Sequence, residues 1–406
     1  MSFRKTIYTF ISLVLMAVCV LCSCAGQPQA AAPAQKSAAI ENNSEVQVTV
    51  PPVPPVVEKT HGFVFSSFED NWVIYYMKDD GSGRVNLTKH SKNNLQPAWS
   101  PDTTKIAFVS DRDEVNNIYV MNVDGSNVTR LTYSTGNVYS PTWSPDSNKL
   151  AFVWGGSLSS NICTMDQDGK NLINLTEGRA GFSDTLSQYP IWSPDGKNIA
   201  FINEKISSSN GVSIYPQIYV YNVMTGDMQN IISGINVTNV FPCWSPDSSK
   251  IAFYSDLATG WTWNIFITNA DGSNTAKLSD VSLYGGRSTD YMESNTPIIH
   301  WAPDGSKIAL MSKQTMEGDT NAGISEKWEI MLIDPDGRNL SDTGKYVYDS
   351  SLVAWSPDSK YLAYVPPSNR YDRLKIAYDN LAIMDIATQE VKTIFDCHAE
   401  KYLTWR

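Results

Sequence analysis

Six aspartates in one recurring motif are the residues of this sequence whose spacing could do chemistry as a group. Each follows Trp-Ser-Pro or, once, Trp-Ala-Pro, and they are Asp102, Asp146, Asp195, Asp247, Asp304 and Asp358. Repeated carboxylates could line a cation site. In a tight turn, however, an Asp side chain accepts hydrogen bonds from nearby backbone N–H groups. We therefore interpret these aspartates as turn formers, and each motif tryptophan as the apolar block that packs one repeat on the next.

Three further sets of residues could act as metal ligands, acids or bases. Asp-x-Asp-Gly at 166–169 and 334–337 resembles a calcium loop but lacks the Glu that the EF-hand places at its twelfth position, so a hairpin turn is favoured. Among the histidines only His300 lies inside an expected strand, where a packed side chain is favoured over a ligand or base. The cysteines at 163, 243 and 397 lack zinc-ligand spacing. We predict no catalytic residue, no metal site and no cofactor.

The motif belongs to a repeat that predicts four antiparallel strands. Its tryptophans stand at 99, 143, 192, 244, 301 and 355, so the repeats are 44 to 57 residues long. An alternating apolar run follows each motif, as at 105–110, then a second run, as at 117–122, and usually an Asp-Gly turn. Period-2 patterning joined by tight turns indicates a meander of hairpins, and this repeat length is that of a propeller blade.

The two ends of the repeat region complete one another. Residues 62–88 supply strands two to four of a repeat, and residues 402–406 supply a first strand that ends at Trp405. Pairing them in one sheet would leave no open edge. We therefore predict an all-β fold over residues 61–406, a seven-bladed β-propeller of four-stranded antiparallel blades closed by its terminal segments.

The Trp-Ser-Pro-Asp and Asp-Gly features resemble the TolB-like, or WD40-like, β-propeller repeat, and the match covers residues 61–406. The sequence departs from TolB in lacking an α/β domain before the propeller, so TolB's envelope role is not carried over. This propeller also precedes serine-peptidase domains, but we find neither Gly-x-Ser-x-Gly nor a following hydrolase domain. Some seven-bladed relatives are oligogalacturonate lyases, which keeps a carbohydrate-active enzyme open as the alternative function.

The N-terminus carries the pattern of an export signal. Arg4 and Lys5 precede an apolar run at 7–21, which ends in Leu21-Cys22-Ser23-Cys24. This ending resembles a bacterial lipobox and implies a signal peptide over 1–23 and a lipid on Cys24, which would attach the protein to a membrane. Residues 24–60 are rich in Ala, Gln, Ser and Pro and are expected to be a disordered tether. We expect an exported protein on the periplasmic or outer side of the bacterial cell envelope.

Irregular insertions mark one rim of the expected propeller. The net charge of −11 argues against nucleic acid as a partner. In a meander, the Ser-Pro-Asp and Asp-Gly turns share one rim, and the long insertions share the other, which usually marks a binding face. We expect a monomer that binds a protein, peptide or glycan there. The candidate ligand-binding residues are Tyr139, Arg179, Tyr189, Trp261, Trp263, Tyr284, Arg287, Asp290, Tyr291 and His300.

Overall fold

The computed structural model describes most of the repeat region. It covers residues 62–133, 135–156, 159–182, 185–206, 213–232, 237–257, 262–279, 283–284, 299–315, 326–347, 352–367, 371–372, 375–376, 380–394 and 401–406. The chain divides into residues 1–52 and residues 53–406, and the described residues all belong to the second unit. The expected signal peptide, Cys24 and the tether therefore lie outside them. A membrane-spanning helix, long and apolar enough to cross a bilayer, does not occur among the residues described.

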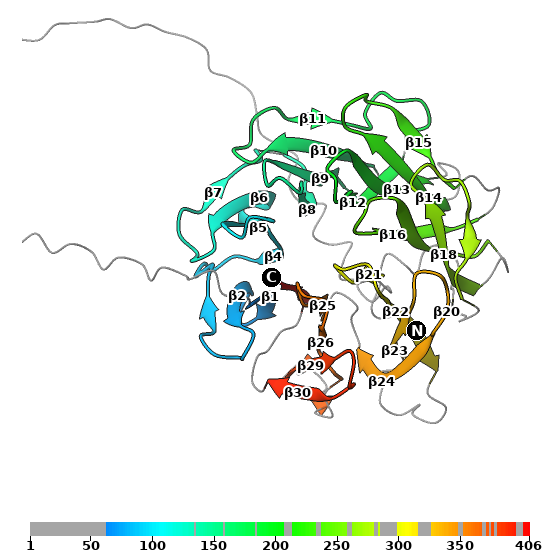
Figure 1. Ribbon diagram of the computed structural model, residues 1–406. Coiled ribbons are helices and arrows are strands. Elements are labelled where there is room, and N and C mark those ends of the chain that lie inside the picture. Colours follow the sequence, from blue (N-terminus) through cyan, green and yellow to red (C-terminus); the bar gives the residue numbers. More distant parts are fainter. Residues whose placement is uncertain are drawn as a thin grey trace, which may run out of the picture. The chain divides into compact units, whose positions relative to one another are not determined.

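The described chain folds into strands that stand around a common centre, and no α-helix occurs in it (Figure 1). The first sheet has the order β3-β2-β1-β31 and contains β1 (Gly62–Phe68), β2 (Trp72–Lys78), β3 (Val85–Asn86) and β31 (Lys401–Trp405). The second contains β4 (Asn94–Trp99), β5 (Lys105–Asp113), β6 (Val115–Asn122) and β7 (Thr129–Arg130). An all-β propeller is thus confirmed.

Eight strands form one continuous sheet next to these. They are β8 (Val138–Trp143), β9 (Lys149–Gly155), β10 (Ser160–Asp166), β11 (Ile173–Asn174), β12 (Thr185–Trp192), β13 (Asn198–Ile206), β14 (Ser213–Asn222) and β15 (Met228–Asn230). A five-stranded sheet follows, with β16 (Asn239–Trp244), β17 (Lys250–Ser255), β18 (Thr262–Asn269), β19 (Ala276–Lys277) and β20 (Leu283–Tyr284).

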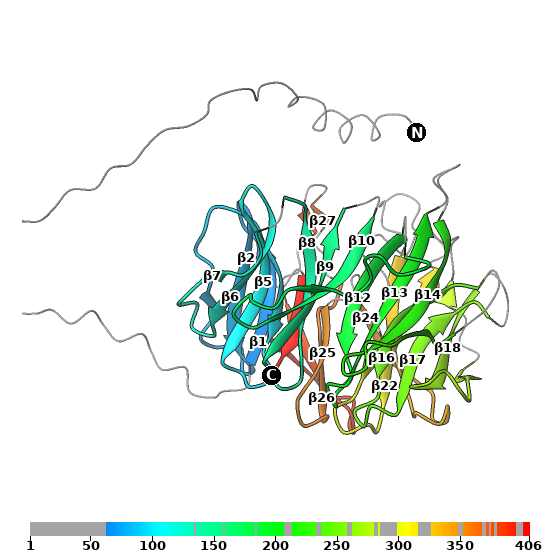
Figure 2. The same cartoon turned by 90° about the horizontal axis from the view of Figure 1, so that it is seen from above.

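Two four-stranded sheets and a small hairpin complete the described chain. The first sheet contains β21 (His300–Trp301), β22 (Ile308–Thr315), β23 (Glu326–Ile333) and β24 (Ser341–Val347). The second contains β25 (Val353–Trp355), β26 (Tyr361–Tyr364), β29 (Leu381–Asp385) and β30 (Val391–Ile394), and the hairpin pairs β27 (Tyr371–Asp372) with β28 (Lys375–Ile376). Figure 2 shows that the long strands run from one rim of the propeller to the other.

The expectation of seven separate blades is not met. Five blades stand as separate sheets, whereas β8–β15 form a single sheet of eight strands. The start of β12 joins them, because it pairs with β13 of its own blade and also with β10 of the blade before it. There Leu186 pairs in parallel with Ser160 of β10, and the Ser160 hydroxyl donates to the Ser187 carbonyl at 3.0 Å.

The C-terminal strand completes the first sheet, as the sequence predicts. Phe63 pairs with Trp405 and Val64 with Thr404, and the two backbones exchange hydrogen bonds between Gly62 and Arg406 at 2.7 and 3.1 Å. Leu403 is buried in a core that includes Phe63 and Phe65. The first and last described strands, β1 and β31, are therefore held together by both backbone pairing and apolar burial.

The motif tryptophans pack one blade on the next. Trp143 is buried among Ala107, Ile118 and Val120 of the preceding blade, and its indole Nε1–H donates to the Ala98 carbonyl at 3.0 Å. The indole of Trp355 donates in the same way to the His300 carbonyl at 2.9 Å. The predicted packing role of these residues is confirmed.

The motif aspartates close their turns. In one turn the Ser144 hydroxyl donates to Asp146 at 2.5 Å and itself accepts the Lys149 backbone N–H at 2.9 Å. The hydrogen bond from Ser144, followed by that from the Asn148 N–H, holds the pKa of Asp146 below its usual value. The aspartates also link blades, because the Asp102 N–H donates to the Ser147 hydroxyl at 3.0 Å. Their interpretation as turn formers is confirmed.

Candidate functional site

Left-handed residues recur on five of the innermost strands of the propeller, and we call them the axial ring. Its members lie three positions before a motif tryptophan, on the innermost strands of Figure 1, and are Gln96, Ser140, Tyr189, Phe241 and Tyr402. Their φ angles lie between 52° and 56°. Such a conformation costs a non-glycine residue about 1–3 kcal/mol and concentrates at functional sites. The same unfavourable geometry on five strands therefore makes the ring a candidate site.

Each ring residue sits at an irregularity of its strand. The pairing register shifts between Leu95 and Ala98 on β4, and at the corresponding place on β8, β12 and β16. A β-bulge bends the strand and redirects a side chain, and bulges are common at barrel rims and beside active sites. The bulges thus aim the ring residues away from the regular inward and outward alternation.

The ring side chains contact one another across blades. The Ser140 N–H donates to the Gln96 side-chain carbonyl at 2.7 Å, and the Gln96 amide donates to the Tyr402 hydroxyl at 3.5 Å. Tyr189 packs edge-on against Phe241 with ring centroids 5.6 Å apart. The ring therefore places the Tyr189 side chain, backed by the buried Phe241, together with the Tyr402 hydroxyl and the Gln96 amide.

The electrostatics of the ring favour a neutral, hydrogen-bonding surface. Burial, with smaller effects of Tyr402 and Glu204, raises the pKa of Tyr189 to about 12. The Tyr189 phenol therefore stays protonated at neutral pH and serves as a hydrogen-bond donor rather than as a base. Hydroxyls and amides beside aromatic faces suit peptide groups or sugar hydroxyls.

An exposed phenylalanine and a half-buried tryptophan pack together on the rim beside the ring, and we call Phe68, Trp72 and Lys401 the rim platform. Phe68 is 44% exposed, and its ring packs edge-on against Trp72 at 5.4 Å. The Lys401 ammonium lies 5.7 Å from the Trp72 ring centroid. Lys401 directly precedes Tyr402 on β31, so the platform adjoins the axial ring.

Hydrogen bonds fix the platform to β4. The Trp72 N–H donates to the Asn93 side chain at 3.1 Å, and the Asn94 amide donates to the Trp72 carbonyl at 3.3 Å. Asp111 in turn accepts both the backbone N–H and the amide of Asn93 at 2.8 Å. Asp256, which directly follows β17 and corresponds to Asp111, accepts the Thr238 N–H at 2.7 Å. The rim strands that carry ring residues are thereby held in place.

The predicted site residues are distributed over several environments. Tyr189 belongs to the axial ring. Tyr139, which directly precedes the ring residue Ser140 on β8, packs against an inter-blade core. Trp263 is buried on β18. Arg179 donates to the carbonyls of Leu175 at 2.6 Å and Gly226 at 3.1 Å, so it joins two neighbouring units.

The remaining candidates do not join the ring within the described residues. His300 lies half-buried on β21, where its backbone carbonyl accepts the Trp355 indole. Tyr284 lies on β20, opposite Thr262. Trp261, Arg287, Asp290 and Tyr291 lie outside the described residues. In the part of the chain that the structure covers, no three His, Cys, Asp or Glu side chains are arranged to hold a metal ion.

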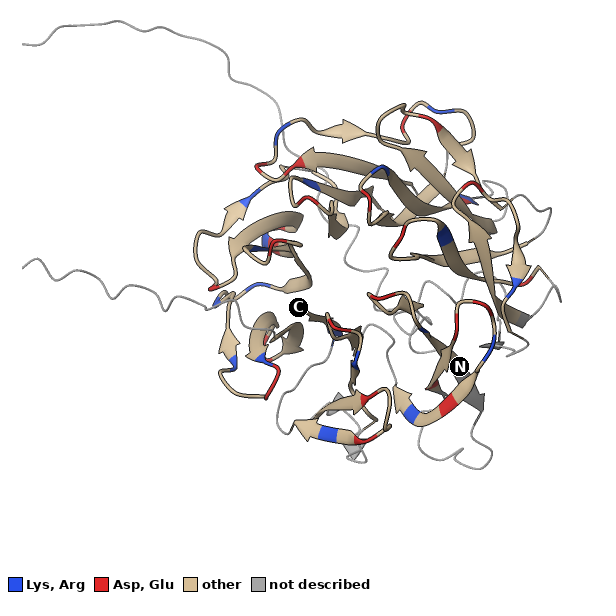
Figure 3. Ribbon diagram, in the orientation of Figure 1, with Lys and Arg blue, Asp and Glu red and all other residues tan. Residues whose placement is uncertain are grey.

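Sequence reasoning missed most of the ring and all of the platform. A signal for the ring was present, because four of its members precede a proline two positions before the motif tryptophan: Gln96-Pro97, Ser140-Pro141, Tyr189-Pro190 and Phe241-Pro242. The sequence gives no comparable signal for the contact of Tyr402 with Gln96, because it joins residues 306 positions apart. Figure 3 shows acidic and basic residues interspersed around the described blades rather than gathered by sign.

Residues 55–294 match the model of the tricorn protease N-terminal β-propeller domain. The chain belongs to this family. The assignment agrees with the resemblance to TolB-like propellers drawn from the repeat. Over 132 residues the chain is 28% identical to dipeptidyl-peptidase 5 of Porphyromonas gingivalis, covering 32% of this chain and 17% of the relative. It thus spans less than a fifth of that protein's length.

Solved propellers resemble the chain in fold. Oligogalacturonate lyase of Vibrio parahaemolyticus superposes with a TM-score of 0.54 at 16% identity, covering 83% of this chain and 85% of the lyase. A puromycin-hydrolysing peptidase of Mycobacterium tuberculosis superposes with a TM-score of 0.56 at 12% identity, covering 84% of this chain and 54% of the peptidase. At these identities the likeness concerns the fold alone.

Proposed function

We propose that this protein is an exported, lipid-anchored binding module that takes a peptide segment of a protein partner at the axial ring and the rim platform. The observation that carries the proposal is the left-handed conformation shared by the five ring residues. Backbone strain that recurs at equivalent positions supports a binding site there, because strained residues cluster where side chains are directed at a ligand. Aromatic faces beside hydroxyls and an amide complement both the apolar side chains and the peptide groups of such a segment.

The relatives favour a peptide over a glycan as the ligand. The curated match is named a dipeptidyl-peptidase, and the second structural neighbour a puromycin-hydrolysing peptidase. Both names indicate action on amide bonds. The other neighbour, an oligogalacturonate lyase, is the reason to keep a carbohydrate-active enzyme as an alternative outcome.

The test is direct binding by the full chain in detergent to an array of peptides and an array of glycans. The variants Tyr402→Phe and Tyr189→Phe each remove one ring hydroxyl, and Tyr361→Phe removes the hydroxyl of a 37% exposed tyrosine on the opposite rim. We expect selected peptides to bind about fivefold more weakly to each ring variant and equally to the Tyr361 variant.

Two results would contradict the proposal. Glycan binding without peptide binding would show that the ligand is a glycan and not a peptide. Cleavage of a glycan probe, seen by mass spectrometry, would favour the carbohydrate-active enzyme. Peptide binding that is equally strong in all three variants would move the site away from the ring.

We further propose that the propeller has seven blades, with β8–β11 and β12–β15 as two of them joined by the extended start of β12. The support is a closed succession of contacts among the strands that end at a motif tryptophan. The succession is β31, β4, β8, β12, β16, β21 and β25, which returns to β31. A crystal structure with six or eight blades would refute this count.

A further inference from the structure

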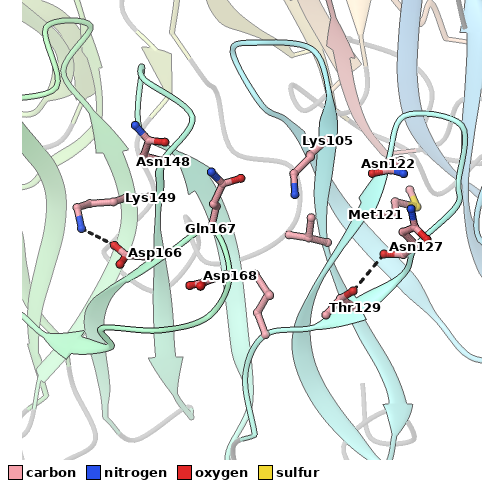
Figure 4. Close-up of a pocket in the computed structure, with 12 residues that line it drawn as sticks. Lys105, Met121, Asn122, Asn127, Thr129, Asn148, Lys149, Asp166, Gln167 and Asp168 are labelled. Carbon is pink, nitrogen blue, oxygen red and sulfur yellow. Dashed lines mark hydrogen bonds and ion pairs between the residues drawn. The ribbon is translucent and has the colours of Figure 1, made fainter.

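A polar groove lies between β4–β7 and β8–β11 on the rim of the Ser-Pro-Asp and Asp-Gly turns, opposite the rim platform (Figure 4). Its cavity has a volume of about 680 Å³. Lys105, Asn122, Asn127 and Thr129 line one wall, and Asn148 and Gln167 lie on the other. This volume falls within the range of ligand pockets, and the lining combines amide and charged side chains with the apolar Val120, Met121 and Leu131.

Lys105 differs from its counterparts in the β8–β11 and β21–β24 blades. The lysine that begins the second strand pairs with an acid at the end of the third strand in two blades, Lys149 with Asp166 and Lys307 with Asp334, both at 2.5 Å. In the β4–β7 blade the residue opposite Lys105 is Asn122. Among the described residues the Lys105 ammonium has neither an ion pair nor a hydrogen bond, although the side chain is half-buried.

The acids that line the same groove are already engaged. Asp166 binds Lys149 and also accepts the Asn171 amide at 2.5 Å, and Asp168 binds Lys170 at 2.7 Å. Figure 4 shows the Lys105 amine pointing into the space between the two walls, with Gln167 facing it from the other side. The groove therefore offers a cation whose charge acts on Asp102 but which forms no ion pair in the described chain, and a ligand carboxylate would accept a charge-assisted hydrogen bond from it.

The side-chain amides that flank Lys105 indicate which kind of ligand would carry that carboxylate. Within the described chain the side-chain amides of Asn127 and Gln167 make no hydrogen bond, so each has donors and an acceptor available. A peptide group presents the matching N–H and C=O. None of the described lining residues is aromatic, whereas a sugar ring would gain from a stacking partner.

We propose that this groove is a second binding site, which takes an acidic peptide segment with an Asp or Glu carboxylate on Lys105 and its peptide groups on Asn127 and Gln167. The site is independent of the axial ring because it lies on the opposite rim.

A pair of substitutions tests the role of Lys105. Lys105→Met removes the charge at similar length, and Asn122→Asp supplies the acid that the β8–β11 blade has at this place. The probes are two labelled peptide pools, one of Asp, Glu, Gly and Ser, and one with Asn and Gln in place of the acids. Fluorescence anisotropy with the full chain in detergent gives the affinities.

The β16–β19 blade provides the matched controls. There Lys250 also pairs in register with an asparagine, Asn269, but does not line the groove. We expect the acidic pool to bind wild type more tightly than the neutral pool. Lys105→Met and Asn122→Asp should weaken that binding about tenfold or more, and Lys250→Met and Asn269→Asp should not change it. Asn122→Asp is expected to melt no lower than wild type, which separates loss of binding from loss of folding.

Three outcomes would overturn the proposal. The first is equal binding of the two pools, and the second is undiminished binding to both groove variants. The third is binding of an acidic polysaccharide such as alginate through Lys105 while the acidic peptides do not bind, which would replace the peptide by a glycan.

Discussion

Removing the buried side chain of the last strand should weaken the closure of the propeller measurably. Leu403 is 4% exposed and packs with Phe63 and Phe65 of β1 and Ala354 of β25. Truncating a buried leucine to alanine costs about 3 kcal/mol. Residues 62–406 number 345, and an unfolding entropy of roughly 2.1 cal/mol/K per residue gives about 0.7 kcal/mol/K, so Leu403→Ala should lower Tm by about 4 °C.

The assay is differential scanning calorimetry of the full chain with two companions. Val391→Ala alters a 39% exposed side chain on the outermost strand β30 and should change Tm by less than about 1 °C. Deletion of 403–406 removes both the Leu403 contacts and the Gly62–Arg406 hydrogen bonds, and should abolish the cooperative transition. If the deletion melts like wild type, the closing role of β31 is refuted.

Three further expectations concern titration and location. Burial raises the pKa of Tyr189 to about 12. The stability that the neutral phenol contributes is therefore complete below the unfolded pKa of about 10 and is lost as pH rises toward 12. Tyr189→Phe should flatten the alkaline fall in Tm, and an unchanged fall would show that Tyr189 ionises freely. The Ser144 hydrogen bond lowers the pKa of Asp146, so its contribution is present above the unfolded pKa of about 4 and lost as pH falls through the folded value. Ser144→Ala should cost about 1 kcal/mol at pH 7 and less at pH 3 in urea unfolding, whereas an equal cost at both pH values would exclude the ionised pair. Cys24→Ala should move the protein from the membrane fraction to the soluble fraction on cell fractionation, and retention in the membrane fraction would argue against a lipid on Cys24.

The repeat made the fold accessible from the sequence. Trp-Ser-Pro-Asp recurs with the alternation of paired strands, and the structure places Trp143 and Asp146 in the packing and turn roles that their chemistry indicates. The pairing of β31 with β1 followed from counting strands at both ends. The fusion of β8–β15 into one sheet did not follow, because it depends on a single parallel bridge between Ser160 and Leu186 that no residue pattern encodes.

The site was harder to predict than the fold. Sequence reasoning selected aromatic and charged residues from the insertions, so it included Trp263, which lies on β18 and is not part of the axial ring. It passed over Gln96 and Tyr402, since neither is unusual until a bulge brings it to the propeller centre beside the other. Backbone geometry, rather than residue type, distinguishes the axial ring.

The most direct test of the axial ring is hydrogen–deuterium exchange of the full chain with and without the tightest peptide from the array. If the ring and platform form the site, the bound peptide should slow exchange in segments 94–99, 185–192 and 401–405, and leave the turn at 144–149 unchanged. Slower exchange confined to the turn rim, with the three ring segments unaffected, would contradict the assignment.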